Sequence, residues 1–183
     1  MKPIAIVILN HNGLKLLKKF LSNVILYSPE ADVVIIDNGS SDNSVSWLKN
    51  NYSDLKRIEL KKNYGYAEGY NRGLKDLDYE YYALLNNDLS VTKGWLPPLI
   101  EEFKAKNKVA IIQPHILNYD NKKNFDYAGA AGGFLDKYGY PFCRGRILNT
   151  VEKDNGQYNK TSEIFWASGA CFLIRKNIFW ELD

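Results

Sequence analysis

Apolar positions in residues 1–112 follow two alternating arrangements. Short apolar stretches are typical of strands covered on both faces, and they predict strands at residues 4–9, 33–36, 55–60, 81–85 and 109–112. Apolar residues three and four positions apart predict a helix after each of the first four strands. Because strand and helix alternate, the sequence predicts an α/β fold with a mostly parallel central sheet flanked by helices.

The regular pattern ends after Gln113. Residues 118–158 are rich in Asn, Lys, Gly, Tyr and Asp and have no sustained period. An irregular stretch of this length inside a compact domain is usually functional or mobile. Regular spacing returns at residues 164–166 and 170–174, and a short helix is expected near Lys176.

The composition limits the classes of partner. A chain of 183 residues is expected to form one domain with a substantial core. Its net charge of +3 is too small and too dispersed to indicate nucleic acid. The early cluster of Lys15, Lys18 and Lys19 has two interpretations, a solvated helix face or a contact with anionic lipid.

The sequence also indicates the cellular compartment in which we expect the protein. Two cysteines make no disulfide framework and have no metal-type partner nearby, which indicates a reducing environment. No apolar run reaches the length of a membrane span, and the N-terminal run is too short for a signal peptide. We therefore expect a soluble, cytoplasmic chain without a transmembrane segment, at most peripheral to a membrane.

Polar clusters follow each of the first four predicted strands. The carboxyl ends of parallel strands share one edge of a sheet, and ligands collect at that edge in α/β folds. Loops are polar by default, so one cluster carries little weight, but four at one edge indicate a ligand site. The clusters are Asn10-His11-Asn12-Gly13, Asp37-Asn38-Gly39-Ser40-Ser41-Asp42, Asn63-Tyr64-Gly65 and Asn86-Asn87-Asp88.

Asp37 and Asn38 are suited to a nucleotide. A carboxylate or an amide at a strand end can accept a hydrogen bond from a pyrimidine N–H or a ribose hydroxyl. The simpler interpretation is that the segment turns the chain and that Ser40 or Ser41 caps the next helix. Both can hold together, because the serines would serve the cap and leave Asp37 free. His11 lies at the same edge, where its ring can stack on a base.

Glycines four positions apart mark the segment Asn63-x-Gly65-x-x-x-Gly69-x-Asn71-x-Gly73. Each glycine costs about 1 kcal/mol relative to alanine in a helix interior, so three on one face indicate close approach of a ligand or of another backbone. Ligand contact and tight packing of the helix on the sheet both stay open for Gly69 and Gly73. Arg72, within the segment, can pair with a phosphate.

Asn86-Asn87-Asp88 ends the fourth predicted strand with one carboxylate. Mg²⁺ usually takes one or two protein carboxylates and completes its shell with phosphate oxygens and water. Asp88 can therefore hold a divalent cation against a diphosphate. The alternative is an ordinary turn, since Asn and Asp favour turns.

In combination these segments resemble the family 2 glycosyltransferases. The runs that carry the resemblance are Val-Ile-Leu-Asn-His-Asn-Gly, Ile-Ile-Asp-Asn-Gly-Ser-Ser-Asp, the glycine-spaced segment and Leu-Leu-Asn-Asn-Asp. Trp166-Ala-Ser-Gly-Ala-Cys-Phe-Leu-Ile-Arg-Lys176 is similar to the later motif Trp-x-x-Gly-Ala-x-x-Leu-Ile-Arg of the rhamnosyltransferase-like branch. The resemblance covers the whole chain in the correct order.

The resemblance implies a single-domain GT-A fold and inverting transfer of a sugar, such as rhamnose, from a nucleoside diphosphate. Residues 1–112 would be the nucleotide-binding half, and residues 113–183 a partial acceptor half. Mg²⁺ or Mn²⁺ would bind Asp88. The implied nucleotide-binding residues are Leu9, Asn10, His11, Asn12, Asp37, Asn38, Asn63, Gly65, Asn71, Arg72, Asn86 and Asn87, and the implied acceptor-side residues are Trp166, Gly169 and Ala170.

The resemblance also implies a general base, which must take the proton of the acceptor hydroxyl. In the family the base follows the Gly-Ala segment, so we expect it beyond Asp183. We accordingly expect a truncated chain that binds the donor and transfers sugar poorly or not at all. Within the chain, Asp126, Glu163 and Glu181 are candidates by proximity only.

The implied partners are a dTDP- or UDP-linked sugar and a glycan or lipid-linked acceptor. Acceptors in this branch are usually growing cell-surface glycans, so we expect a role in bacterial cell-wall polysaccharide assembly at the inner face of the membrane. The alternative is a non-catalytic nucleotide- or carbohydrate-binding module. A dehydrogenase is excluded, because the turn after the first strand lacks Gly-x-Gly-x-x-Gly.

Overall fold

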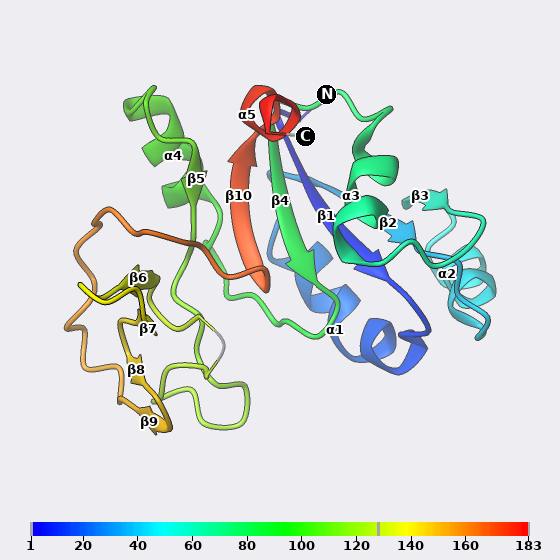
Figure 1. Cartoon of the computed structure of the whole chain (residues 1–183). Helices are drawn as coiled ribbons and strands as arrows, with labels where there is room; N and C mark the ends of the chain where they lie inside the picture. Colours follow the sequence, from blue (N-terminus) through cyan, green and yellow to red (C-terminus); the bar gives the residue numbers. More distant parts are fainter. Residues whose placement is uncertain (1, 128, 183) are drawn as a thin grey trace. The chain divides into compact units, whose positions relative to one another are not determined.

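Two structural units make up the chain. The computed structural model describes residues 2–127 and 129–182 (Figure 1). Unit 1 consists of Met1–Ala110 and Leu173–Asp183, and unit 2 of Ile111–Phe172. Asp183, beyond which the base is expected, lies outside the described residues. The functional division into halves 1–112 and 113–183 stays a prediction.

β1 lies in the middle of the parallel strands of unit 1. Its neighbours are β2 and β4, β3 follows β2, and all these pairs are parallel. In this register Asn10 lies opposite Asp37, and Leu9 lies opposite Asn86, so polar strand ends share one edge. The strands are β1 (Ile4–Asn10), β2 (Asp32–Asp37), β3 (Lys56–Glu59) and β4 (Tyr81–Asn86).

β10 (Cys171–Arg175) is the next strand after β4 in the sheet and runs in the opposite direction (Figure 1). At its end the backbone N–H of Lys176, the first residue of α5 (Lys176–Glu181), donates to the carbonyl of Glu80 just before β4. The carboxyl end of β10 therefore lies beside the amino end of β4. The sheet is still mainly parallel, which confirms the predicted fold class.

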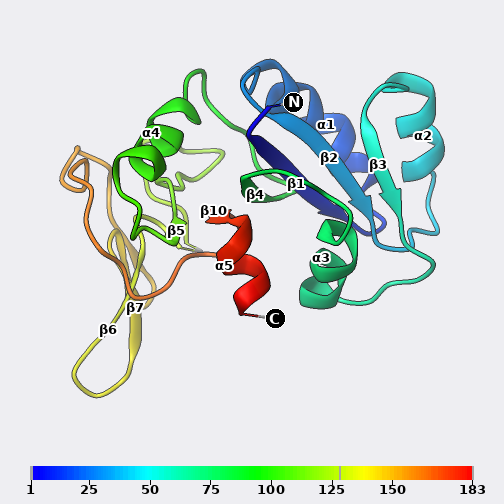
Figure 2. The same ribbon diagram turned by 90° about the horizontal axis from the view of Figure 1, so that it is seen from above.

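Helices cover both faces of the parallel strands. α1 and α2 lie on one face, and α3 lies on the other (Figure 2). α4 begins with two prolines, which are tolerated in the first turn because helix N–H groups there have no intrahelical partner. None of the described helices is long and apolar enough to cross a bilayer. The helices are α1 (Leu14–Leu26), α2 (Ser44–Asn51), α3 (Tyr66–Leu74) and α4 (Pro97–Ala105).

Unit 2 contains a small antiparallel sheet within residues 118–158, where the sequence predicted no regular elements. That prediction was wrong, because strands of two or three residues are too short to leave a period in the sequence. Phe125 and Cys143 belong to the buried core of this unit, and Trp166 packs against it. The strands are β5 (Ile111–Ile112), β6 (Gly133–Leu135), β7 (Pro141–Cys143), β8 (Arg146–Ile147) and β9 (Thr150–Val151), of which the last four form the sheet in that order.

Candidate functional site

Asn10 joins the carboxyl ends of three strands. Its side chain is fully buried at the end of β1. Its Nδ2 donates to Oδ1 of Asp37 (3.1 Å), at the end of β2, and to Oγ of Ser40 (3.2 Å). Its Oδ1 accepts from Nδ2 of Asn87 (3.1 Å), which follows β4. The structure therefore brings Asn10, Asp37 and Asn87 into one hydrogen-bonded group.

Gly13 makes room for this group. A Cβ at Gly13 would lie 2.3 Å from Oδ1 of Asn10 and 2.3 Å from Nδ2 of Asn87, the two atoms of one hydrogen bond. The φ of Gly13 is −104°, which any residue adopts, so space and not backbone conformation requires glycine. The sequence contains no local signal for this role of Gly13, because the contact depends on distant strand ends.

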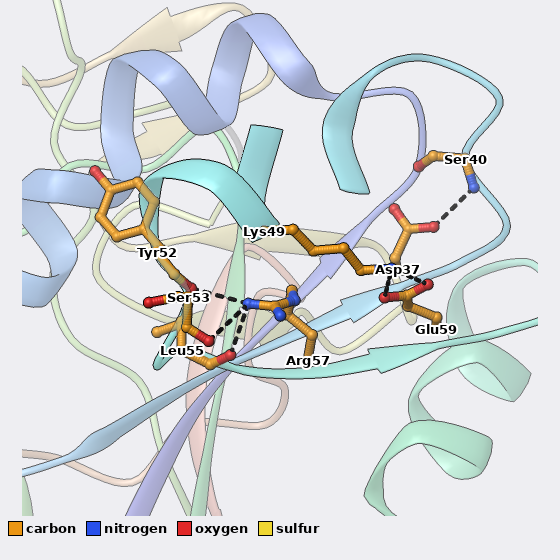
Figure 3. A network of polar contacts seen from close by, with 8 residues as sticks. All are labelled: Asp37, Ser40, Lys49, Tyr52, Ser53, Leu55, Arg57 and Glu59. Atoms are coloured by element: carbon orange, nitrogen blue, oxygen red, sulfur yellow. Dashed lines mark hydrogen bonds and ion pairs between the residues drawn. The ribbon is translucent and has the colours of Figure 1, made fainter. Parts of the chain in front are cut away.

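The carboxylate of Asp37 is not free. It is only 3% exposed, and its Oδ2 accepts the backbone N–H of Ser40 (2.9 Å; Figure 3), while Asn10 bonds its Oδ1. The expectation that Asp37 stays free was therefore wrong. Each carboxylate oxygen still has a second lone pair. A contact between Asp37 and a nucleotide stays a prediction.

Asp42 caps both neighbouring helices, in place of the predicted Ser40 or Ser41. Its Oδ2 accepts the N–H of Leu14 (3.1 Å), the first residue of α1, and its Oδ1 accepts the N–H of Ser44 (2.9 Å), the first residue of α2. Burial by itself would raise the pKa of Asp42, but hydrogen bonds from Ser44 and Leu14 outweigh it and hold the pKa below its usual value. The Asp two positions before α2 was a signal that the sequence analysis missed.

Asn12 stabilises the loop between β2 and α2 through hydrogen bonds. Its Oδ1 accepts the backbone N–H groups of Ser41 (2.7 Å) and Asp42 (3.1 Å), and its φ of +52° is one that asparagine tolerates. Next to it, Nδ1 of His11 lies 3.0 Å from the carbonyl oxygen of Asn38, which holds the exposed ring at the edge of the sheet. Stacking of His11 on a base stays a prediction.

Asn38 connects β2 to the segment before α3. It is 2% exposed, its Nδ2 donates to Oδ1 of Asn63 (3.0 Å) and to the carbonyl of Gly65 (2.8 Å), and its Oδ1 accepts the N–H of Tyr64 (3.0 Å). Both ends of this amide are used within the protein. Asn38 therefore shapes the loop at residues 63–65.

Gly69 and Gly73 serve packing of α3 on the sheet. A Cβ at Gly73 would lie 2.2 Å from Cδ1 of Ile36, and one at Gly69 would lie 2.9 Å from Nδ2 of Asn38. Of the two interpretations left open, the structure favours tight packing. Gly65 lies before the helix with a φ of +80°, and no atom of the described residues lies within 4 Å of its added Cβ. The expectation of three glycines on one helix face was therefore wrong.

Arg72 is engaged on the surface of α3. Its Nε lies 2.6 Å from Oε1 of Glu68, and its guanidinium lies 4.1 Å from the ring centroid of Tyr64. About half of each charged side chain is exposed, so the ion pair is weak and can exchange for another anion. Pairing of Arg72 with a phosphate stays a prediction, as does a contact from the half-buried Asn71.

Asp88 is exposed in the turn after β4. Within residues 2–127 and 129–182 its carboxylate has no hydrogen bond and no ion pair. Nδ2 of the neighbouring Asn87 points to Asn10, which leaves the Oδ1 of Asn87 as an acceptor. A carboxylate and an amide oxygen are donors that Mg²⁺ and Mn²⁺ accept. The described part of the chain has no group of three or more His, Cys, Asp or Glu for a metal, so a cation here would depend on oxygens of a bound ligand.

The acceptor-side residues lie in unit 2. The indole of Trp166 covers Gly133, where a Cβ would lie 1.9 Å from Cε2, and its Nε1 donates to the carbonyl of Phe134 (3.3 Å). Trp166 therefore supports the hairpin of β6 and β7. Gly169 is exposed and Ala170 is half-buried. Contact of these residues with an acceptor stays a prediction.

The three candidate bases lie in different places. Asp126 is half-buried and Glu163 is exposed, both in unit 2. Glu181 ends α5, which begins beside the amino end of β4 (Figure 1). It therefore lies at the opposite edge of the parallel strands from Asp88, which does not suit a base at the donor edge. The identity of the base stays a prediction.

Sequence comparison relates the chain to enzymes of glycan synthesis. The family model described as Glycosyl transferase family 2 matches residues 5–183. Poly-beta-1,6-N-acetyl-D-glucosamine synthase of Staphylococcus epidermidis is 33% identical over 114 residues, which cover 59% of this chain and 27% of that protein. Low-salt glycan biosynthesis hexosyltransferase Agl10 of Haloferax volcanii is 26% identical over 184 residues, which cover 98% of this chain and 54% of that protein. The chain thus spans only about a quarter to a half of these relatives.

Solved structures share the fold. Mannosyltransferase PcManGT from Pyrobaculum calidifontis, in complex with GDP-Man and Mn²⁺, superimposes with a TM-score of 0.56 at 18% identity, covering 63% of this chain and 36% of that chain. S. aureus TarS 1–349 in complex with UDP-GlcNAc gives a TM-score of 0.54 at 20% identity, covering 63% and 34%. Likeness at this level of identity concerns the fold alone, which is the predicted GT-A fold.

Proposed function

Because the chain belongs to glycosyltransferase family 2, we propose that it binds a nucleoside-diphosphate sugar for inverting transfer to a glycan or lipid-linked acceptor. One observation carries the proposal. Asn10 joins the ends of β1, β2 and β4, and the same edge presents the exposed carboxylate of Asp88. The names of the relatives, a polysaccharide synthase and a hexosyltransferase, support it.

The residues of unit 1 would bind and orient the donor. The loops held by Asn12 and Asn38 would surround the nucleoside, and the exposed ring of His11 would stack on its base. Arg72 would leave Glu68 to pair with a phosphate, an exchange that costs little for an exposed ion pair. Asn10 would act indirectly, because its hydrogen bond with Asn87 would fix the turn that carries Asp88.

Asp88 and Oδ1 of Asn87 would hold Mg²⁺ or Mn²⁺ together with the diphosphate. The cation, when bound, would stabilise the negative charge of the leaving diphosphate. Since one carboxylate supplies little charge by itself, we propose that metal and nucleotide bind together.

The finer assignments rest on the family resemblance. We propose a dTDP- or UDP-linked donor, with rhamnose as the sugar, and a polysaccharide acceptor at the inner face of the membrane. Membership of the family speaks against the alternative of a non-catalytic binding module.

The test is a calorimetric titration of Mn²⁺ with and without UDP or dTDP. We expect measurable Mn²⁺ affinity only with nucleotide, and at least a tenfold loss of that affinity in Asp88→Asn. The unfolding temperature without ligand should not change, because Asp88 is exposed. Asp76→Asn is the matched control, since Asp76 is an exposed carboxylate outside the site. Tight Mn²⁺ binding without nucleotide, or unchanged binding in Asp88→Asn, would refute the proposed site.

A further inference from the structure

The turn after β4 that carries Asp88 is held on both sides by side chains of other elements. Before Asp88, Nδ2 of Asn87 donates to Oδ1 of Asn10 (3.1 Å), at the end of β1. Asp88 is exposed, and within residues 2–127 and 129–182 its own carboxylate makes no hydrogen bond that would fix it. The place of this carboxylate therefore depends on what holds the chain next to it.

Asn23 of α1 holds the chain on the other side of Asp88. Its Oδ1 accepts the backbone N–H of Val91 (2.7 Å) and the hydroxyl of Ser90 (3.1 Å). The acceptor is the amide oxygen, because a backbone N–H can only donate. Val91 is buried, and Asn23 and Ser90 are half-buried, so water competes little for these two hydrogen bonds.

The two anchors leave little freedom to the turn. Only Asp88 and Leu89 lie between the anchored residues, and so short a segment between two fixed points has few backbone conformations. The connection from β4 to α4 is tied to the α1 region at a second place, just after the helix, where Nε1 of Trp95 donates to Oγ of Ser28 (3.0 Å). That hydrogen bond lies farther along the chain from Asp88, so it holds the connection in place without constraining the turn.

We propose that Asn23 is a positioning residue for the cation site, because its hydrogen bonds to the segment after the turn keep the carboxylate of Asp88 in place. The inference rests on the proposed function, in which Asp88 binds the cation. Without Asn23, the turn has to be ordered when the cation binds, and this loss of conformational freedom weakens binding. Hydrogen-bond partners behind metal ligands typically contribute about ten- to a hundredfold to metal affinity. Since Asn23 acts through the backbone, we expect the lower value.

The experiment is a calorimetric titration of Mn²⁺ in the presence of UDP or dTDP. Asn23→Ala removes both hydrogen bonds and should lower the Mn²⁺ affinity about tenfold. Asn23→Asp keeps an oxygen acceptor at the same position and should bind Mn²⁺ at least as tightly as the wild type, because its charge also attracts the cation. Ser90→Ala removes one of the two hydrogen bonds, so its Mn²⁺ affinity should lie between those of Asn23→Ala and the wild type.

The matched control is Ser28→Ala. It removes the hydrogen bond between Trp95 and Ser28, and so it weakens the attachment of the same connection at a place away from the turn. Unfolding in urea should show a loss of stability in both Ser28→Ala and Asn23→Ala, but the Mn²⁺ affinity of Ser28→Ala should equal that of the wild type. Hydrogen exchange checks the contact itself, since the N–H of Val91 should exchange faster in Asn23→Ala than in Ser28→Ala.

The inference is wrong if Asn23→Ala binds Mn²⁺ like the wild type, if Asn23→Asp or Ser28→Ala loses as much affinity as Asn23→Ala, or if the exchange of the Val91 N–H is unchanged in Asn23→Ala. Asp88→Asn in the same titration separates this inference from the proposed function. If Asp88→Asn loses the cation and Asn23→Ala does not, only the positioning role fails. If Asp88→Asn binds Mn²⁺ like the wild type, the proposed cation site fails, and the positioning role fails with it.

Discussion

Replacing Gly13 with alanine tests whether the group around Asn10 organises the candidate site. The added Cβ would lie 2.3 Å from Oδ1 of Asn10 and from Nδ2 of Asn87, so their hydrogen bond must open. The backbone itself accepts alanine, because φ is −104°. Any loss of stability in Gly13→Ala would therefore result from the crowded side chains and not from backbone strain.

The magnitude follows from the bonds of Asn10. Opening the hydrogen bond between Asn10 and Asn87 costs about 1 kcal/mol. Displacing Nδ2 of Asn10 from the buried carboxylate of Asp37 costs about 1.5–3 kcal/mol, because the acceptor is charged. Alanine offsets about 0.4–1 kcal/mol by restricting the unfolded chain. We expect a net loss of roughly 2–3 kcal/mol in the free energy of unfolding, or about 4–12 °C in Tm for a chain of this size.

Equilibrium unfolding in urea measures the loss, and calorimetry with UDP or dTDP and Mn²⁺ measures the effect on the site, which should be weaker binding. Asn87→Ala is the matched variant, because it opens the same hydrogen bond without crowding. In that background Gly13→Ala should cost less than in the wild type, since Asn10 can then move aside. If Gly13→Ala is as stable as the wild type, or if the two losses simply add, the reasoning is wrong.

Two further predictions concern residues outside the proposed donor contacts. Arg175 donates from Nε to the carbonyl of Val109 (2.7 Å) and from Nη2 to that of Phe103 (2.6 Å). Arg175→Ala should lower the free energy of unfolding in urea by about 2–4 kcal/mol. Arg175→Lys should lower it by less, because lysine keeps the positive charge but lacks the forked donors of the guanidinium. An unchanged urea midpoint of unfolding for Arg175→Ala would contradict this prediction. The pKa of Asp42 is lower in the folded than in the unfolded chain, so the ionised carboxylate stabilises the folded state. This stabilisation is fully present above the unfolded pKa of about 4 and is lost as the pH falls through the folded pKa. The stability gap between wild type and Asp42→Asn should therefore be widest near neutral pH and should close in acid, and a gap independent of pH would count against the cap.

The strands and helices of unit 1 were predictable because their signals are local. Residues 33–36 and 81–85 are continuous apolar runs, and β2 and β4 contain them. The sheet of unit 2 was not predictable in this way. Its strands have two or three residues, and its turns use positive φ at Gly139 and Gly145. The sheet is therefore defined by the hydrogen-bonded pairing of its strands and not by a periodic pattern in the sequence.

Local patterns were enough to show which residues stand at strand ends. Buried parallel strands that finish on polar residues put Asn10, Asp37 and Asp88 at one edge, and that much followed from the order of residues. The folded chain was needed to show that Asp37 is occupied, that Gly13 is required for space and that Asp88 is exposed. The physical reason is distance along the chain. Asn10 and Asn87 are 77 positions apart, and a hydrogen bond between them leaves no trace in either local sequence.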